Sequence, residues 1–301
     1  MKPAKFDEIL ALWSEHDTLE NDLGDTGAEG VEQLVESLNA YFADKEQQVS
    51  VLGVDIYQYS RYDNGRQRLI PSVFRFSYEM AKRFCQHREE FLFQDQQFED
   101  NFISTGDGGF QIFATPLHAL VFAAYFQVAL NGYNSFFAWP RVRNFVGALS
   151  LRYAITTGSV FRQDSNFYGS AIINNARILS RDALNRLLID STTVDWFHRS
   201  IGSVESLLML SREELQALPV FAEYKPKESK NSLIFSTRSS SDPSIRSLHL
   251  QKIGLVAAKN TQLDVYNLQV QIGFTLTVRE NAPTRRIVVS LGNLNTTGIS
   301  A

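Results

Sequence analysis

The order of the segments predicts an α+β fold in which helices cover one sheet of the split βαβ type. A short apolar run begins at Gln48, ends at Asp55 and precedes a segment with helical periodicity. Two strand-like runs then meet at the glycine-rich turn 106–109. A helix, a strand, another helix and another strand follow, and this alternation is what favours the fold class.

The composition limits the class of protein. A hydrophobic fraction of 44% and an aromatic fraction of 12% in 301 residues are typical of a packed globular chain. The single cysteine, Cys85, excludes an intramolecular disulfide and fits a reducing cytoplasm. Asp and Glu interrupt the N-terminus where a signal peptide needs an apolar core, and no apolar run is long enough to span a membrane. With a net charge of -4 and no basic stripe, we expect a cytoplasmic protein that binds neither membrane nor nucleic acid.

We predict that residues 1–46 form an N-terminal helical arm. Two amphipathic segments within 6–43 flank a Gly/Asp-rich stretch, with apolar residues at helical spacing at Leu10, Trp13, Leu34 and Leu38. We expect this arm to serve packing or dimerisation.

The central elements follow from periodicity. A helix is predicted over 72–91 from apolar residues three and four apart: Val73, Phe76, Met80, Phe84, His87 and Phe91. Strands are predicted over 97–105 and 109–115. The next helix is predicted to be capped by Thr115, to start at Pro116 and to bury Leu117, Leu120, Val121, Ala124 and Val128.

Further strands are predicted over 148–160 and 185–193, with a helix over 170–180 between them. The apolar stripe of that helix is Ile172, Ala176 and Leu179, continuing to Ala183. Residues 239–250 are polar and predict a linker, and the period-two runs 263–281 and 285–293 predict strands. The expected division is therefore an arm 1–46, a main domain 47–238 and a small β-rich C-terminal domain 239–301.

Two acidic residues are candidates for metal binding. Asp55 ends one strand and Asp107 occupies the turn between two others, so their carboxylates converge if those strands are neighbours. Mg²⁺ and Mn²⁺ prefer carboxylate oxygens, and two such ions bind both oxygens of a phosphoryl displacement. The alternative is that Asp107 only stabilises a turn and Asp55 only ends a strand.

Arg177 adds a third candidate. The helix over 170–180 places Asn174, Arg177 and Arg181 on one face, away from the apolar stripe. Such an arginine is either a solvated charge or a group that stabilises a pentavalent phosphorus.

Three motifs carry a resemblance to class III nucleotide cyclases over residues 49–235. They are "VDIYQYS", "ISTGDGGFQIF" and "YGSAIINNARIL". The resemblance implies the cyclase-type split βαβ sandwich with a ferredoxin-like core. It also implies two Mn²⁺ or Mg²⁺ ions held by Asp55 and Asp107 beside Ile56, and Arg177 as the arginine that stabilises the transition state.

The same resemblance implies a nucleotide site. The backbone amides of Ile56, Tyr57 and Gln58 would hold the triphosphate, and Lys225, in "YKPK", would contact a phosphate. The family builds each site across a head-to-tail homodimer, with the metals from one chain and the base-reading residues and arginine from the other.

Two positions depart from the purine cyclases. Ile103 and Asn166 stand where adenylate cyclases have Lys and Asp and guanylate cyclases have Glu and Cys. Ile103 offers a purine no hydrogen bond, whereas the Asn166 amide matches the edge of uracil or, reversed, of cytosine. Tyr57 and Phe102 are bulky enough to narrow such a pocket, unless they are core residues.

This combination resembles the bacterial pyrimidine cyclases of Pycsar anti-phage systems. The resemblance implies conversion of UTP, or else CTP, to a cyclic nucleotide that activates a separate cyclic-nucleotide-responsive effector. Ile173 occupies the position of the ribose-binding asparagine, which leaves a catalytically silent regulatory homologue as an alternative. A GGDEF-like or polymerase-palm enzyme shares the two-metal chemistry, but its signature is not in the sequence.

Overall fold

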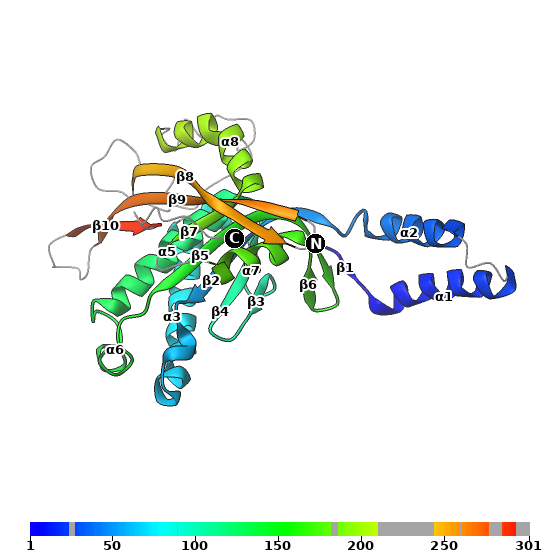
Figure 1. Cartoon of the computed structure of the whole chain (residues 1–301). Helices are drawn as coiled ribbons and strands as arrows, with labels where there is room; N and C mark the ends of the chain where they lie inside the picture. Colours follow the sequence, from blue (N-terminus) through cyan, green and yellow to red (C-terminus); the bar gives the residue numbers. More distant parts are fainter. Residues whose placement is uncertain are drawn as a thin grey trace.

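The computed structural model describes residues 1–23, 28–88, 90–181, 186–209, 244–258, 261–276 and 285–292. Its α-helices are α1 (Phe6–Leu23), α2 (Ala28–Phe42), α3 (Asn64–Arg88), α4 (Glu90–Phe93), α5 (Pro116–Asn134), α6 (Pro140–Val146), α7 (Ser170–Arg181) and α8 (Ser191–Met209), and a 3-10 helix η1 spans Tyr59–Arg61 (Figure 1). No helix in these ranges is long and apolar enough to cross a bilayer.

The strands join into one sheet. They are β1 (Pro3–Ala4), β2 (Gln47–Ile56), β3 (Phe102–Ser104), β4 (Gly108–Phe113), β5 (Leu151–Gln163), β6 (Asn166–Tyr168), β7 (Leu187–Asp190), β8 (Ser244–Ala258), β9 (Thr261–Leu276) and β10 (Arg285–Leu291). The main strand order is β10-β9-β7-β5-β2-β4-β3, while β1 and β6 pair with β5 and β8 pairs with β9.

The predicted α+β fold is confirmed. Within the order β5-β2-β4-β3, α3 connects β2 to β3 and α5 connects β4 to β5, which is the split βαβ arrangement. Beyond β5, α7 leads to β7, which pairs with β5 in parallel. The two central strands, β2 and β5, are antiparallel over ten residue pairs from Gln47 to Ile56.

The sheet is covered on both faces, because successive side chains of a strand point to opposite sides. Along β2, Leu52 and Val54 pack in the main core with residues of α3 and α5. Val51 instead packs in a second cluster with Ala171 of α7. Asp55 shares the parity of Val51, so it belongs to the α7 face of the sheet.

The helix predicted over 72–91 begins eight residues earlier, at Asn64, and contains Pro71. A proline has no N–H, so the carbonyl of Gln67 loses its usual helical donor. The Tyr59 hydroxyl donates to that carbonyl at 3.0 Å, which explains how the helix continues through Pro71.

The buried face of α3 also differs from the predicted stripe: among the stripe residues whose side chains the structure describes, which exclude Phe91, only Val73 is buried. Phe76, Met80 and Phe84 are half-buried, and His87 is exposed. The residues of α3 that are buried are Ile70, Val73, Phe74, Ser77, Tyr78, Ala81 and Cys85.

The helix α5 matches its prediction at its start and its core. Pro116 is its first residue, and the five residues predicted to be buried all are. Thr115 stands at the N-cap position, but its hydroxyl bonds His118 Nδ1 at 2.7 Å in place of a backbone amide. Fourteen residues of α5 are buried, because it lies between the sheet and α3.

Helix α7 follows its predicted bounds, but its buried face is rotated from the predicted stripe. Ala176 is exposed and Ile172 is half-buried, whereas Leu179 is buried as predicted. A polar residue, Asn175, is fully buried at the centre of the face that meets the sheet. Its amide Nδ2 donates to the carbonyl oxygens of Val51 (2.8 Å) and Ala154 (3.0 Å).

Two strand predictions were wrong in extent. Of the segment 97–105 only Phe102–Ser104 is a strand, and the residues before it form turns. Of the segment 185–193 only Leu187–Asp190 is a strand, because the unpredicted helix α8 begins at Ser191. Asp190 ends that strand by accepting a hydrogen bond from the Thr193 amide at 2.9 Å, as a helix-capping aspartate does.

The predicted linker 239–250 was wrong for residues 244–250, which begin the 15-residue strand β8. The predicted strands that follow correspond to β9 and β10. Through β9, which pairs with β7, all three extend the central sheet. The proposed domain boundary at residue 239 lies outside the described residues and stays a prediction.

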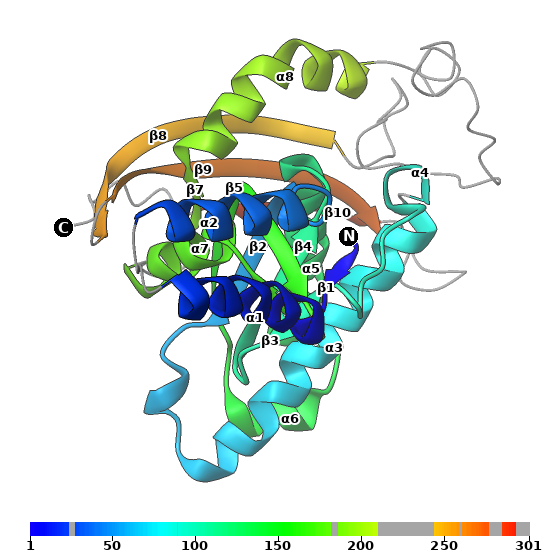
Figure 2. The same cartoon turned by 90° about the vertical axis from the view of Figure 1, so that its right-hand side faces the viewer.

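The N-terminal arm consists of α1 and α2, which lie side by side and project from the rest of the molecule (Figures 1 and 2). The Tyr41 hydroxyl links the two helices: it donates to Glu8 at 2.6 Å and accepts from the Lys5 amide at 3.0 Å. Ring contact between Phe42 and Phe161 anchors the base of the arm to β5. Leu10 and Trp13, predicted to be amphipathic positions, are exposed.

Candidate active site

The turn 106–109 places Asp107 beside the end of β2. Gly106 has a φ of +99°, which favours glycine, and a side chain at Gly108 would lie 2.3 Å from the Val54 carbonyl oxygen. The glycines therefore allow the β3–β4 hairpin to approach β2 closely. The Ile56 amide donates to the Asp107 carbonyl at 3.3 Å, and Asp55 is paired with Gly108 across the two strands.

Asp55 is bound by an arginine from the strand on its other side. Arg152 of β5 pairs with Asp55 in register, and its Nε donates to Asp55 Oδ2 at 2.9 Å. A second nitrogen of the same guanidinium also bonds that oxygen. The two side chains are about four-fifths buried, with 21% of Arg152 and 18% of Asp55 exposed. Such a partly buried, charge-assisted contact is stronger than a surface ion pair.

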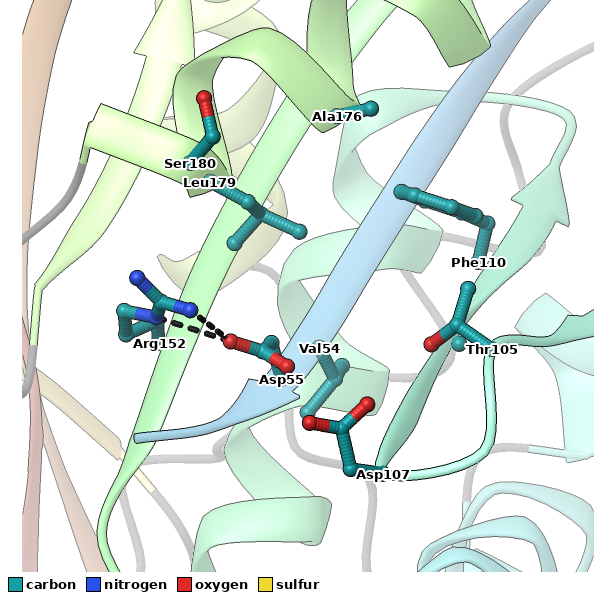
Figure 3. Close-up of a pocket in the computed structure, with 10 residues that line it drawn as sticks. Val54, Asp55, Thr105, Asp107, Phe110, Arg152, Ala176, Leu179 and Ser180 are labelled. Atoms are coloured by element: carbon teal, nitrogen blue, oxygen red, sulfur yellow. Dashed lines mark hydrogen bonds and ion pairs between the residues drawn. The ribbon is translucent and has the colours of Figure 1, made fainter. Parts of the chain in front are cut away.

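Asp55, Asp107 and Arg152 line one open cavity of about 240 Å³ (Figure 3). The rest of its wall comes from the strands and hairpin around Asp55 and from α7. These residues are Val54, Thr105, Gly109 and Phe110, and Ala176, Leu179 and Ser180 of α7. Both carboxylates face this cavity, with Arg152 on the far side of Asp55 from Asp107. The predicted convergence of Asp55 and Asp107 is thus present in the geometry of a single chain.

The pKa of Asp107 is raised above its ordinary value, first by burial and then by the negative charge of Asp55. The charge of Arg152 and a backbone hydrogen bond act in the opposite direction. Two carboxylates near each other with one arginine leave uncompensated negative charge, which a divalent cation relieves.

This raised pKa predicts a stability that depends on pH. The folded state binds the Asp107 proton more tightly than the unfolded state, so ionised Asp107 costs stability at neutral pH. As the pH falls through the raised pKa toward the ordinary value of 3.8, that cost disappears. In chelator-treated buffer, Asp107→Asn should therefore stabilise the chain most at neutral pH and progressively less in acid. Denaturant titrations of both proteins between about pH 4 and 7 measure this, and a difference independent of pH would contradict it.

The residues of this cavity fit divalent cations. They supply two carboxylates on adjacent strands with room for further oxygen ligands, which is the donor set that Mg²⁺ and Mn²⁺ prefer. In the described part of the chain, no cluster of three or more His, Cys, Asp or Glu side chains offers a more complete set. A cation here would complete its coordination with water or with oxygens of a ligand.

The predicted phosphate-binding amides are partly engaged within the chain. The Ile56 amide bonds Asp107, and the Tyr57 amide donates to the Ser150 carbonyl at 2.9 Å. Gln58 is a non-glycine residue in the left-handed region, with φ 57° and ψ 34°. Its strained backbone marks the sharp turn after β2, and triphosphate binding by these amides stays a prediction.

Arg177 does not line the carboxylate cavity, although Ala176 on one side of it and Ser180 one turn later do. It is half-buried, and its guanidinium lies 3.5 Å from Asn174 Oδ1. Ile173 is 50% exposed. A single chain therefore does not bring Arg177 together with Asp55 and Asp107.

The predicted base-reading residues also lie outside this cavity. Ile103 on β3 is half-buried against the apolar cluster that contains Phe167 and Ala171. Asn166 is exposed at the start of β6, next to Phe167. Phe102 packs against Tyr78 of α3, with ring centroids 4.8 Å apart, so it is a core residue. Lys225 lies outside the described residues.

Sequence reasoning missed Arg152. It is the charged residue within an otherwise apolar strand run, which was the available signal. Its partner Asp55 is 97 residues away, so the pair becomes visible only once β2 and β5 are known to be neighbours. The guanidinium also lies over the Tyr57 ring, 5.8 Å from its centroid.

No protein-family model and no curated protein matches the sequence. Solved structures do match. The adenylyl cyclase CyaB from P. aeruginosa is 10% identical, with a TM-score of 0.43 over 79% of this chain and 98% of that one. The adenylate/guanylate cyclase/hydrolase from Silicibacter pomeroyi is 15% identical, with a TM-score of 0.39 over 74% and 97%.

A third match is the guanylate cyclase domain of RhGC from Catenaria anguillulae, solved in complex with GTP. It is 11% identical, with a TM-score of 0.41 over 74% of this chain and 97% of that one. These are similarities to cyclases. At such identities and TM-scores they assign no activity to this chain.

Proposed function

We propose that the chain is a nucleotide cyclase that converts UTP to 3′,5′-cyclic UMP and pyrophosphate. The observation that supports this most is the convergence of Asp55 and Asp107, with Arg152, on one cavity at the end of β2. Two carboxylates next to an arginine are suited to divalent cations and phosphate oxygens together. The motif resemblance to class III cyclases supplies the reaction class.

In this mechanism Asp55 and Asp107 would hold two Mn²⁺ or Mg²⁺ ions. When bound, these ions would activate the ribose 3′-hydroxyl for in-line attack on the α-phosphate and neutralise the leaving pyrophosphate. Arg152, which binds Asp55 in the structure, would be the residue that contacts a phosphate oxygen of the nucleotide. Phe110 and Leu179 form the apolar part of the wall, which limits the access of water to the reacting groups.

The remaining residues are proposed to act across a homodimer. Arg177 is absent from its own chain's carboxylate cavity, as expected if it serves the cavity of the partner. There it would stabilise the charge that develops on the phosphorus. Ile103 and Asn166 would likewise read the base bound to the other chain. The cyclic nucleotide would then act on a separate effector in anti-phage defence.

The decisive assay incubates the purified protein with ATP, GTP, CTP and UTP separately in the presence of Mn²⁺, with product detection by mass spectrometry. We expect cyclic UMP as the main product and cyclic CMP as the next. Failure to form any cyclic nucleotide would favour the silent regulatory homologue, a reading supported by the exposed Ile173 at the ribose position. Dinucleotide or polymer products would instead favour a GGDEF-like or palm enzyme.

The choice of base gives a sharper prediction at Asn166. Its amide can donate to O4 of uracil and accept from N3–H, whereas an aspartate only accepts. Asn166→Asp should therefore lower kcat/KM for UTP about 10-fold to 100-fold relative to CTP, because O4 of uracil would no longer receive a hydrogen bond from the side-chain amide. Asn144→Asp, at an exposed position on α6, is the matched control and should change neither rate. Equal losses for both nucleotides would contradict base reading by Asn166.

A further inference from the structure

A second surface, whose residues do not line the carboxylate cavity, combines exposed aromatic rings with arginines on α6, the loop before it and the first turns of α3. We call it the aromatic–arginine patch and define it by Arg68, Phe137, Trp139, Arg141 and Phe145. Phe137 is 71% exposed, Trp139 59% and Phe145 52%. The helices that carry them are in contact, because Trp139 packs against Phe76 of α3, with ring centroids 6.1 Å apart, and Arg66 of α3 donates to the Phe145 carbonyl at 3.1 Å. Single exposed apolar residues are ordinary, but several large exposed rings on adjoining elements are typical of a binding surface.

The patch is a firmly held surface. Phe136 and Trp139 are both in the left-handed region, with φ values of 62° and 52°, which is unfavourable for such residues. Hydrogen bonds hold this backbone in place: Asn134 exchanges two with Leu149, at 2.8 and 2.9 Å, and Arg143 Nε donates to the Asn134 carbonyl at 3.1 Å. The rings are thus presented on a preorganised scaffold, which lowers the entropic cost of binding.

The helical arm has the complementary composition. From Phe6 to Asp44 the sequence is rich in Asp and Glu and contains neither Lys nor Arg. Exposed apolar side chains accompany these acids, among them Leu10, Trp13 and Val35. On α2, Glu32 and Glu36 are exposed immediately after Val31 and Val35.

We propose that the aromatic–arginine patch binds the acidic arm of a second copy of this chain. In one chain the arm projects at one end of the molecule and α6 lies at the other (Figure 1), so the contact is between copies. Because the arm is acidic and the patch carries arginines, electrostatic attraction favours binding of the arm to the patch. Pairing of two arms would instead bring Asp and Glu side chains together, with no Lys or Arg on either helix to compensate their charge. The contact is heterologous, so it closes into a dimer only if a two-fold axis lets both arms bind.

This contact is independent of the proposed cyclase activity, and site-specific cross-linking tests it. The one native cysteine, Cys85, is buried, so introduced surface cysteines react selectively. A full-length chain with Ser14→Cys, on the exposed side of the arm, is mixed with one carrying Asn144→Cys beside the patch. Under mild oxidation we expect a disulfide-linked heterodimer in at least tenfold greater yield than from Ser14→Cys mixed with Val288→Cys, at an exposed site on β10.

Equal yields for the two mixtures would overturn the proposal. A dominant homodimer of the Ser14→Cys chain would overturn it in favour of arm-to-arm pairing. A dimer formed through the carboxylate faces alone would link neither pair preferentially, so it is distinguishable.

Charge reversal tests the electrostatic part of the contact. Arg68→Glu with Arg141→Glu on the patch chain should lower the heterodimer yield at least fivefold. Glu32→Lys with Glu36→Lys on the arm chain should restore it. Raising the ionic strength should also lower the wild-type yield, because exposed charges are screened over about 8 Å at physiological salt. A yield unaffected by these reversals would exclude charge complementarity as its cause and overturn the assignment.

Discussion

Replacing Asp107 with asparagine is expected to lower cyclic-nucleotide formation by a factor of about 1,000 or more, with no loss of folding stability. A carboxylate that holds a catalytic cation accounts for several kcal/mol of transition-state stabilisation, and each 1.36 kcal/mol corresponds to about a factor of ten in rate. The fold should not suffer, because burial and the charge of Asp55 already disfavour the ionised side chain. Loss of activity would therefore report the cation site and not misfolding.

The measurement is the initial rate of product formation with saturating Mn²⁺, together with the free energy of unfolding of each variant. Asp100→Asn removes an exposed carboxylate from the preceding turn and is the matched control, for which we expect an unchanged rate. Asp55→Asn should also abolish activity. Unlike Asp107→Asn, it should lower the free energy of unfolding, because it removes the charge of the carboxylate that Arg152 binds. If the Asp107 variant kept wild-type activity, the two-carboxylate site would have to be abandoned.

The second large effect is expected at Gly53. A Cβ added there would lie 2.0 Å from Asn175 Oδ1 and 2.6 Å from Leu179 Cδ1, so α7 would have to move away from β2. Gly53→Ala should therefore destabilise the chain by about 1–3 kcal/mol, the usual cost of overpacking. Asn175→Ala should cost a similar amount, because it leaves buried carbonyls of Val51 and Ala154 without the side-chain donor.

The double variant distinguishes this contact from two unrelated effects. Because Asn175→Ala removes the nearer of the two obstructing atoms, the combined loss should be smaller than the sum of the single losses by about 1 kcal/mol. Chemical denaturation of the four proteins measures the coupling. Gly132→Ala is the control: its Cβ would meet nothing closer than Phe137 at 4.0 Å, so this helical change should be neutral or stabilising. Strict additivity of the Gly53 and Asn175 changes would refute the coupling.

The contact between Gly53 and Asn175 also bears on the proposed site. Ala176, Leu179 and Ser180 line the cavity of Asp55, and the buried Asn175 amide fixes the height of α7 above β2. A shift of α7 would move one wall of the cavity and reposition Arg177. We therefore regard Asn175 as a positioning residue, which acts through the helix and not on a bound nucleotide.

Part of this molecule follows from local sequence. The short apolar run of strand character predicted β2 and its end near Asp55, and the glycines around Asp107 predicted the hairpin turn. The start of α5 at Pro116 follows from the preference of proline for the first helical turn. These features depend on interactions between residues close in the chain, so the residue pattern is sufficient to predict them.

Periodicity was less reliable where distant residues compensate for a local defect. The apolar periodicity placed the start of α3 at residue 72, but the helix continues through Pro71 because the Tyr59 hydroxyl supplies the missing donor to the Gln67 carbonyl. The stripe predicted for α7 omitted Asn175, because a polar residue is expected to be exposed unless its buried hydrogen-bond partners on β2 and β5 are known. The polar stretch at 244–250 likewise reads as a linker, although pairing with β9 makes it a strand.

The sequence alone therefore determined the α+β class, the strand ends that carry Asp55 and Asp107, and the composition of the acidic arm. Only the tertiary structure decided that Arg152 binds Asp55, that Arg177 lies outside its own chain's cavity, and that the C-terminal strands extend the central sheet. The physical reason is the same in each case. Local propensity and alternation record which side of a segment is apolar, but strand order and helix position are fixed by contacts between residues far apart in the chain.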